Sequence, residues 1–412
     1  MKKPLLITGI TLSLLTACQQ QPSRQPFVEQ TALELTQEDK AMIESCNDFA
    51  FNFLQKTNEW KKPEKNIFLS PLSALFNAGM LANGASGNTA REWEAVLPAS
   101  NSNLQSVNAF FLKLLDQLPR RDSTTTFHAA NSIWIDQKAP VKTSFLEINR
   151  RYYRAEVQNL KFSDPQSVRR INQWTQEQTQ GRISRVLDKA QGDCILINTL
   201  FFQGAWTDPF DPADTRQENF YPTEGESHPV RMMHRSGAWL RYRETAQLEM
   251  ATLPYGNHSY ALTVLLPKRG ISVDSCIQTL AEAEERDWWA AADTIYRNLD
   301  LKLPSFQLDY QTSLIPIYEE MGIHDAFQPY QADFSRLTEQ PSYISNILQF
   351  THLDVTETRT VAAAATVTQV NFLSETISQT ASHPFHVNRP FLIAIHENPS
   401  GLILFLGKVT AL

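Results

Sequence analysis

Near its C-terminal end the chain carries the run Glu357-Thr-Arg-Thr-Val-Ala-Ala-Ala-Ala-Thr-Val-Thr-Gln-Val-Asn-Phe-Leu373, with four alanines in a row. Alanine has the highest intrinsic helix propensity, so such a run usually indicates helix. The flanking threonines and valines are β-branched, however, and suit an extended strand better. No glycine or proline interrupts residues 357–382, and no charge lies between Arg359 and Glu375. The segment is therefore compatible with a solvated helix, a linker or a strand, and the rest of the chain must decide.

Length and composition describe an ordinary globular protein. Of the 412 residues, 42% are hydrophobic and 20% charged, which is enough to bury a sizeable core. Length alone would allow two or three domains, but we find no repeat and no internal linker, so we expect a single domain over 41–412. The net charge of −7 and the scattered basic pairs argue against a nucleic-acid partner. We expect a monomer.

The N-terminus has the pattern of an export signal. Lys2 and Lys3 precede an apolar run over 5–15 that is too short to span a bilayer and ends in Leu15-Thr16-Ala17-Cys18. This resembles a bacterial lipoprotein signal, in which residues 1–17 are removed and Cys18 is lipidated; a plain secretory signal with a chance cysteine is the alternative. Residues 18–40, rich in Gln, Pro and Ser, suggest a flexible tether. We expect a membrane-anchored lipoprotein of the outer membrane or cell surface, with a periplasm-facing orientation left open.

Three further cysteines, Cys46, Cys194 and Cys276, match no zinc or redox spacing. Their odd number and the size of the chain predict structural burial for most of them and no disulfide framework.

Hydrophobic periodicity predicts helices early in the chain and strands later. Helices are expected at 41–60, from Ser70-Pro71 to Asn83-Gly84, and at 104–118, 143–156, 275–285 and 312–322. Strands are expected at 67–69, 127–135, 195–202, 229–233, 238–243, 247–253, 259–266, 299–308, 390–396 and 402–409. This order, with few βαβ alternations, indicates an α+β fold with large antiparallel sheets. Asn198 lies inside the apolar run 195–202 and must find hydrogen-bond partners there.

A search for catalytic motifs finds none. The sequence has no phosphate-binding glycine loop, no H-E-x-x-H metal site and no G-x-S-x-G nucleophile elbow. His383 and His386 could share a metal, but two histidines beside a strand are more simply structural. Ser70 and Ser73 begin a helix, where serine more often caps than catalyses. We therefore expect no enzyme activity, no cofactor and no metal.

A series of motifs along the chain resembles the signatures of the serpin family, in serpin order across 41–412. They are Asn66-Ile-Phe-Leu-Ser-Pro-Leu-Ser73, Ile171-Asn-Gln-Trp174, Thr179-Gln-Gly-Arg-Ile183, Leu196-Ile-Asn-Thr-Leu-Phe-Phe-Gln-Gly-Ala-Trp206, Pro209-Phe210, Met232-Met233, Leu253-Pro-Tyr-Gly256, Leu303-Pro304, Met321-Gly-Ile323, Asn388-Arg-Pro-Phe391 and Phe405-Leu-Gly-Lys408. The resemblance implies three β-sheets with eight or nine helices. It also implies an exposed reactive-centre loop at about 357–387.

The resemblance also implies a function. The loop serves as bait for a serine protease, with cysteine proteases as a further class. The protease becomes acylated on the loop, and the cut loop inserts into the main sheet as a strand and traps the protease. The alternative is a non-inhibitory serpin that acts as a carrier or adhesion scaffold.

The family pattern assigns the hinge of this loop to Glu357, Arg359, Thr360, Val361, Ala362, Ala363, Ala364, Ala365 and Thr366. Because side chains alternate along a strand, one face would carry Thr360, Ala362, Ala364, Thr366, Thr368, Val370 and Phe372. These are small or apolar, as the buried face of a crowded sheet requires. Arg359 falls on the opposite face, at a place usually held by glycine.

Counting by the family's spacing from Glu357 places the scissile bond at Leu373–Ser374, with Phe372 and Ile377 as alternatives. No Lys or Arg occurs between 360 and 388, so trypsin-like proteases should be poor targets. A large apolar residue before the bond suits chymotrypsin-, elastase-, cathepsin G- or subtilisin-like proteases.

The resemblance further implies a buried shutter cluster of Ser70, Ser73, Asn198 and Gln349. Gln349 replaces the usual histidine but can still donate and accept hydrogen bonds. Ser305 stands where many serpins have a lysine that pairs with the hinge glutamate, so Glu357 is predicted to lack that partner. Both changes would loosen the closed sheet, giving either easier insertion or easier latency.

Overall fold

The computed structural model describes residues 33–61, 66–98, 103–192, 194–223, 225–282, 295–358 and 382–412. The predicted signal and Cys18, the hinge from Arg359 to Thr366 and the candidate scissile bonds lie outside these ranges.

The described chain contains eight α-helices and three hydrogen-bonded sheets, which confirms the α+β prediction. The helices are α1 (Gln37–Trp60), α2 (Pro71–Ala82), α3 (Gly87–Val96), α4 (Leu104–Gln117), α5 (Thr143–Tyr153), α6 (Pro165–Gln178), α7 (Val273–Ala281) and α9 (Ile315–Glu320), with short 3-10 turns η1 (Leu118–Arg120), η2 (Pro212–Asp214) and η4 (Asp325–Phe327).

The strands divide among a nine-stranded, a three-stranded and a two-stranded sheet. The first has the order β1 (Asn66–Leu69), β14 (Ile403–Val409), β13 (Phe391–Glu397), β8 (Tyr260–Pro267), β7 (Leu248–Tyr255), β6 (His228–Glu244), β9 (Ile295–Pro304) and β12 (His383–His386), and β5 (Arg216–Phe220) also pairs with β6. The second has the order β3 (Glu156–Leu160), β2 (Thr125–Asp136) and β4 (Cys194–Gly204), and the third pairs β10 (Phe306–Ser313) with β11 (Leu348–Val355).

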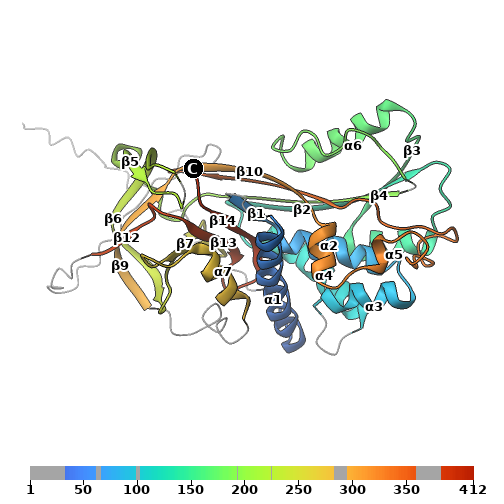
Figure 1. The fold of residues 1–412 in the computed structure, drawn as a ribbon, viewed down its shortest axis with the longest axis horizontal. Coiled ribbons are helices and arrows are strands. Elements are labelled where there is room, and N and C mark those ends of the chain that lie inside the picture. The colour runs from blue at the N-terminus through green and yellow to red at the C-terminus, as the bar shows by residue number, and fades with distance from the viewer. Residues whose placement is uncertain are drawn as a thin grey trace, which may run out of the picture.

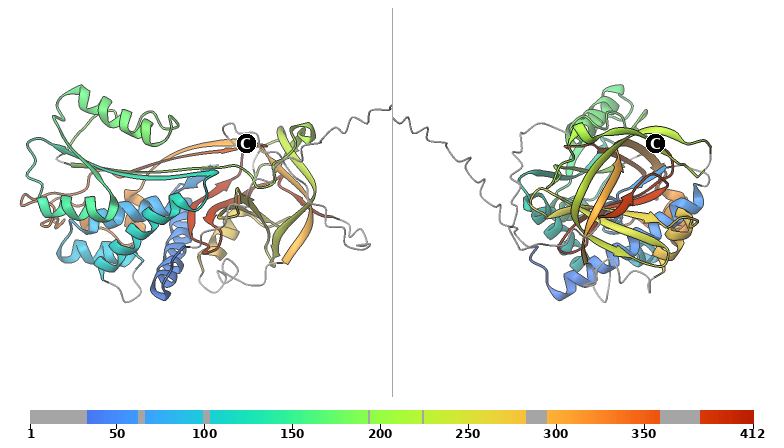
Figure 2. Two further views of the ribbon diagram at one scale, coloured as in Figure 1. Left: turned by 180° about the vertical axis from the view of Figure 1, so that it is seen from behind. Right: turned by 90° about the vertical axis from the view of Figure 1, so that its left-hand side faces the viewer.

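The two smaller sheets form one layer of long strands. Figure 1 shows β2, β4 and β10 running along the upper part of the molecule, with α6 above them and α2, α3, α4 and α5 below. The view from behind in Figure 2 shows the same arrangement, with the strands of the large sheet gathered at the opposite end from α3 and α5.

The central helix α2 is buried along its whole length. Its sequence is apolar on every side, which is typical of a helix enclosed by protein. Ser70 caps its first turn by accepting a hydrogen bond from Ser73 N, and Pro71 follows at the first helical position, where its missing N–H is not needed. α2 thus supports the layer of long strands from below.

A second, smaller core lies between α6 and the layer. Trp134 of β2 and Trp174 of α6 make an edge-to-face contact with ring centroids 5.9 Å apart, and Ile171 and Phe162 pack beside them. Phe350 of β11 also packs against this cluster. α6 therefore covers strands of both smaller sheets at once.

Several elements differ from the prediction. The strands expected at 229–233 and 238–243 form one strand, β6, because Gly237 adopts a positive φ of 73° and the ladder to β9 continues across a bulge. The strand expected at 299–308 is divided after Pro304 into β9 and β10, since proline has no N–H to continue the ladder. The helix expected at 312–322 is shortened to α9, because β10 runs on to Ser313.

The N-terminal boundary also differs. α1 begins at Gln37 with a capping box between Thr36 and Asp39, and Leu33 and Leu35 pack against the core. The flexible segment predicted for 18–40 therefore does not extend over 33–40, because these residues supply a cap and apolar contacts.

Cys46 and Cys276 are buried and Cys194 is half-buried, and none of the three forms a disulfide in the described part of the chain. Burial raises the pKa of the Cys276 thiol to about 11, which keeps it protonated and unreactive. Among the described helices, we find none that is both long and apolar enough to cross a membrane.

Candidate functional site: an open strand gap and its hinge

Two strand edges face each other in the long layer. β4 pairs with β2 on one side, β11 pairs with β10 on one side, and within the described ranges neither strand has a ladder on its other edge. An unpaired edge presents a row of N–H and C=O groups that a further strand can use. The layer is therefore divided at the place where one more strand would join its two parts.

A narrow cleft of about 30 Å³ lies along this division. Its walls come from Phe201 to Gly204 of β4 and from His352 to Asp354 of β11. Neighbouring strands lie about 4.7–4.9 Å apart, so a strand cannot enter unless β4 and β11 first move away from each other. The contacts that hold β11 in place oppose this separation of the two strands.

Below the gap, β11 is held to the start of α2. Gln349 accepts a hydrogen bond from Ser70 N at 3.0 Å and donates to Ser70 O at 2.8 Å, while Thr351 Oγ1 donates to Phe68 O at 2.6 Å. Ser70 Oγ in turn donates to Leu404 O at 3.0 Å. Gln349 thus both donates and accepts, as its amide allows.

The other two predicted shutter residues meet beside this group. Ser73 Oγ donates to Asn198 Oδ1, and Asn198 Nδ2 donates to Asn131 Oδ1 at 2.5 Å. Asn131 Nδ2 bonds Tyr153 O at 2.6 Å, and the Tyr153 hydroxyl donates to Asn108 Oδ1 at 2.6 Å. The structure therefore brings Ser70, Ser73 and Asn198 close to one another, while Gln349 contacts only Ser70 among them.

At the base of the hinge, Glu357 has a cationic partner after all. Arg231 Nη2 lies 2.6 Å from Glu357 Oε1, and Thr215 Oγ1 donates to the same oxygen at 3.0 Å. The prediction that Glu357 lacks a partner, made because position 305 is serine, is wrong. Ser305 N bonds Arg231 O at 2.8 Å, so an arginine on the adjacent strand supplies the cation that residue 305 does not.

These contacts keep the Glu357 carboxyl ionised. Burial by itself would raise its pKa, but the hydrogen bonds from Arg231, from the backbone and from Thr215 outweigh burial and lower the pKa below its usual value. The backbone at this point is held as well, because Phe210 N donates to Glu357 O at 2.9 Å and Trp206 Nε1 donates to Thr356 O at 2.8 Å.

A charged group also lies across the cleft. Arg182, which follows α6, places Nη1 3.1 Å from Asp354 Oδ2 of β11. His352 lies between Asp354 and Asp309, with ring nitrogens 3.2 and 2.6 Å from their carboxylate oxygens. Burial raises the pKa of Asp309, but its hydrogen bond with His352 outweighs this and lowers it. If β11 shifts relative to α6, the Arg182–Asp354 ion pair must either break or move together with β11.

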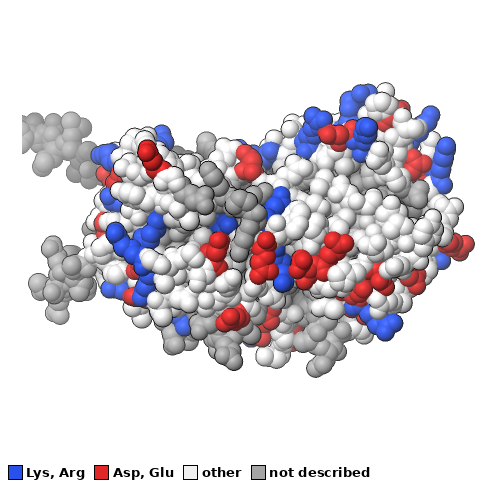
Figure 3. Space-filling view, viewed as in Figure 1, with Lys and Arg blue, Asp and Glu red and all other residues white. Residues whose placement is uncertain are grey.

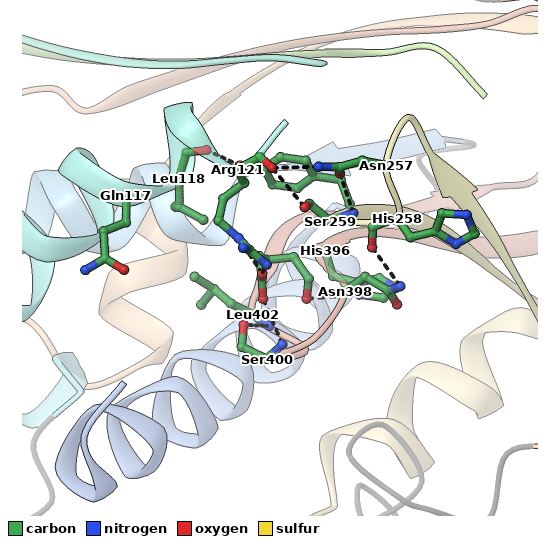
Figure 4. Close-up of polar contacts among 12 residues, drawn as sticks. Gln117, Leu118, Arg121, Asn257, His258, Ser259, His396, Asn398, Ser400 and Leu402 are labelled. Carbon is green, nitrogen blue, oxygen red and sulfur yellow. Dashed lines mark hydrogen bonds and ion pairs between the residues drawn. The ribbon is translucent and has the colours of Figure 1, made fainter. Parts of the chain in front are cut away.

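A buried ion pair between Arg121 and Glu397 joins the segment after η1 to β13 of the large sheet. Arg121, after η1, donates from Nε and Nη2 to Glu397 Oε1 at 2.9 and 2.5 Å, and Ser400 N donates to Glu397 Oε2 at 2.7 Å (Figure 4). The carbonyl of Arg121 accepts from Asn257 and Ser259. Removing one partner of such a pair costs about 3–5 kcal/mol, so this junction ties the connection between α4 and β2 firmly to the large sheet.

The two histidines considered as metal ligands do not share a site. His383 Nε2 lies 2.9 Å from Glu249, whereas His386 Nε2 lies 2.8 Å from Asp300, which also bonds His234 at 2.6 Å. No cluster of three or more His, Cys, Asp or Glu side chains with metal-binding geometry occurs in the described part of the chain.

Sequence reasoning missed Arg231, Asn131 and Arg182. Asn131 had a usable signal in the sequence, because it is a polar residue inside the strand predicted for 127–135. The structure adds that it is the cross-strand partner of Asn198. Arg231 had none, since 126 residues separate it from Glu357.

The described structure thus combines a layer with two unpaired strand edges, β4 and β11, and a glutamate held by an arginine after β11. A family model described as Serpin (serine protease inhibitor) matches residues 44–412. Glia-derived nexin of Mus musculus is 29% identical over 360 residues, which cover 84% of this chain and 88% of that protein. Antithrombin-III of Homo sapiens is 29% identical over 375 residues, which cover 88% and 80%.

Among solved structures, the native state of the thermophilic serpin tengpin superposes with a TM-score of 0.80 at 27% identity and covers 93% of this chain and 96% of its own. The chain belongs to the serpin family.

Proposed function

We propose that this protein is a suicide-substrate inhibitor of serine proteases, with cysteine proteases as a further target class, that prefers a large apolar residue before the scissile bond. The family description as serine protease inhibitors supports inhibition in general. The unpaired edges of β4 and β11, with Glu357 held at the end of β11, carry the proposal for this chain. It has no catalytic role of its own.

The proposed mechanism is the one that the family resemblance implies. A target protease attacks the carbonyl before the scissile bond, its serine or cysteine becomes acylated by that carbonyl, and the peptide bond breaks so that the amine of the following residue leaves. The freed segment then enters between β4 and β11 from the Glu357 end, pulling the attached protease with it.

Strand addition supplies the driving force. Each new ladder hydrogen bond contributes about 0.5–1.5 kcal/mol net, so a dozen or so supply on the order of 10 kcal/mol. That equals the stability of a typical domain, and the loop-out form is then maintained by kinetics.

The decisive experiment mixes the protein with chymotrypsin, neutrophil elastase, cathepsin G or subtilisin and looks for an SDS-stable complex. Ala364→Arg should turn the inhibitor into a substrate, because it places a charge on the face that becomes buried. Ala363→Arg is the matched control on the opposite face and should still form complex. Absence of complex with every protease tried, or equal complex formation by both variants, would contradict the mechanism.

The second candidate is a non-inhibitory carrier or adhesion scaffold. The small and uncharged residues expected on the inserting face favour inhibition, because a carrier has no need of a loop that fits inside a sheet. A loop that is cut without trapping the protease and without a gain in stability would favour the carrier instead.

We also propose that Cys18 carries a lipid that anchors the protein to a membrane, at the outer membrane or cell surface. The supporting observation is the Leu15-Thr16-Ala17-Cys18 sequence after a short apolar run. Metabolic labelling with palmitate should mark the wild type and not Cys18→Ala. Equal labelling of both would overturn the anchor.

A further inference from the structure

His396 is a histidine enclosed by the strands of the nine-stranded sheet. It lies on β13, and only 5% of its surface is exposed (Figure 4). Its Nε2 atom lies 2.9 Å from Thr263 Oγ1 of β8, which in turn lies 2.9 Å from Thr252 Oγ1 of β7. A row of polar side chains therefore crosses three neighbouring strands inside the core. The loop-insertion mechanism gives this imidazole no role.

The surroundings of His396 favour its neutral form. Burial lowers the pKa of His396 to about 3, a hydrogen bond with the Glu397 backbone carbonyl raises it only in part, and Arg241 of β6 lowers it further. The Glu397 carboxylate does not neutralise a charged imidazole, because its oxygens accept hydrogen bonds from Arg121 and from Ser400 N. A proton on His396 is thus a buried charge that is costly to hold.

The groups that β8 and α1 contribute beside His396 are uncharged. β8 contributes Thr263 and Tyr260, whose phenol stays neutral because burial raises its pKa, and α1 contributes Asn47, which accepts a hydrogen bond from Ile403 N opposite His396. The surface differs, because Figure 3 shows Lys, Arg, Asp and Glu side chains spread over the visible face, where water screens them. A proton added at the surface therefore costs little, whereas one added to His396 disturbs the sheet.

The β13–β14 ladder shifts its register at His396. The residue before it pairs with Phe405, but His396 pairs with Ile403, so Leu404 is an extra residue on β14 without a cross-strand partner in β13. A bulge of this kind disrupts the ladder locally and leaves the extra residue unpaired within it. Leu404 O accepts a hydrogen bond from Ser70 Oγ at 3.0 Å instead.

Ser70 connects this bulge to the strand gap. Its backbone N–H and carbonyl hold Gln349 of β11, at 3.0 and 2.8 Å, while its hydroxyl holds Leu404 of β14. A displacement of the bulge that removes Leu404 O from Ser70 therefore acts on the same residue that holds β11. A change at His396 reaches β11 through the bulge and the contacts of one serine.

We propose that His396 is an acid-sensitive switch of the strand gap: when its imidazole takes up a proton, the β13–β14 bulge opens toward water, Leu404 separates from Ser70, and β11 is released from the start of α2. The intact loop then inserts without a protease, and the inhibitor becomes inert in acid while it stays ready near neutral pH. That the inserted form is inert rests on the proposed inhibitory function, whereas the opening of the gap does not.

The experiment follows the uptake of a fluorescent synthetic peptide with the sequence of residues 360–372 by the full-length protein at pH 7 and pH 5. Both values lie above the ordinary titration range of carboxylates, so histidines are the side chains that change charge between them. An imidazole that is neutral in the closed form and titrates near pH 6.5 in the open form favours opening about 20-fold more at pH 5 than at pH 7. Uptake by the wild type should be faster at pH 5 by about that factor.

Two variants interrupt the switch. His396→Gln keeps a hydrogen-bonding group for Thr263 but cannot take up a proton, so its uptake rates at the two pH values should agree within about twofold. Ser70→Ala should speed uptake at pH 7 and lose most of the acid effect, because its contact with Leu404 is already absent. Thermal midpoints at pH 7 report whether each variant folds, and should His396→Gln fail to fold, the Ser70→Ala result decides by itself.

Two matched controls replace other histidines and should keep the acid effect. His352→Gln removes the imidazole that lies at the gap itself, between Asp309 and Asp354. His324→Gln removes an exposed imidazole.

The switch is overturned if the wild type takes up peptide equally fast at both pH values or takes up none, or if His396→Gln keeps the acid acceleration. Loss of the acceleration in His352→Gln alone would assign it to the histidine at the gap and would equally overturn the proposal. A wild type that forms no SDS-stable complex with any protease contradicts the proposed function instead, and peptide uptake still decides the switch.

Discussion

At the scale of single residues, Arg231 and Glu357 decide how firmly the end of β11 is held. Glu357 has a side chain only 12% exposed, while that of Arg231 is 61% exposed, so the pair is partly screened by water. Its importance comes less from the attraction itself than from the cost of leaving the buried carboxylate without its charged donor.

Arg231→Met should therefore speed spontaneous conversion to an inert, loop-inserted form by about fivefold, equivalent to about 1 kcal/mol. Ser305→Lys in the same chain should restore the wild-type rate, because residue 305 is the hydrogen-bonded neighbour of Arg231. The rate is measured as loss of inhibitory activity with time at 37 °C, with the exposed Arg185→Met as control. A double variant no slower than Arg231→Met would contradict this arrangement.

The same pair predicts a pH dependence. The pKa of Glu357 is lowered in the folded protein, so the stabilisation from Arg231 is complete above the unfolded pKa, about 4.3, and is lost as the pH falls through the folded value. Conversion rates of wild type and Arg231→Met should differ at pH 7 and at pH 5, and should approach each other only as the pH falls below the unfolded pKa of about 4.3 toward the lowered folded value. A difference that disappears already between pH 7 and pH 5 would mean that the carboxylate is not what Arg231 holds.

At the scale of elements, β11 is attached at its two ends and open along one edge. Gln349 attaches it to Ser70 at the start of α2, Thr351 attaches it to Phe68 of β1, and the Glu357 contacts hold the residues after its other end. Because the edge of β11 that faces β4 carries no ladder within the described residues, β11 and β10 can move away from β4 without breaking ladder hydrogen bonds, which is what insertion of another strand requires.

Gln349→Ala should lower the free energy of unfolding by about 1–3 kcal/mol, because Ser70 N is left buried without a partner. Gln307→Ala, an exposed glutamine on neighbouring β10, is the matched control and should stay within about 0.5 kcal/mol of the wild type. Urea unfolding followed by circular dichroism measures both. Equal stability of the two variants would show that the Gln349 contacts are not part of what holds β11.

At the scale of the whole molecule, the fold has a stable frame and a divided layer. The Arg121–Glu397 junction and the fully buried α2 belong to the frame, while β4 and β11 border the division. Filling the division would unite the two smaller sheets, so the molecule should be more stable after its loop is cut than before.

Cleavage of the loop by a protease that is not trapped should raise the thermal midpoint by about 10–15 °C, given a gain on the order of 10 kcal/mol. Calorimetry of intact and cleaved protein tests this, and cleaved Ala364→Arg should show a much smaller rise. A cleaved wild-type protein that melts with the intact one would contradict insertion.

Local signals were sufficient for much of this fold. Ser70 and Pro71 mark the start of α2, because a helix cap and a first-turn proline act within a few residues of each other in the chain. The run of consecutive apolar residues around Asn198 likewise identifies the strand β4. The motifs shared with the family supplied the order of these parts along the chain.

The amino-acid sequence by itself thus determined the fold class and the family, since both depend on local pattern or motif. Only the tertiary structure decided that Arg231 pairs with Glu357 across 126 residues, and that Glu357 follows β11, a strand whose second edge has no ladder within the described residues. The physical reason is that strand register brings together residues far apart in sequence, and no window of consecutive residues contains that information.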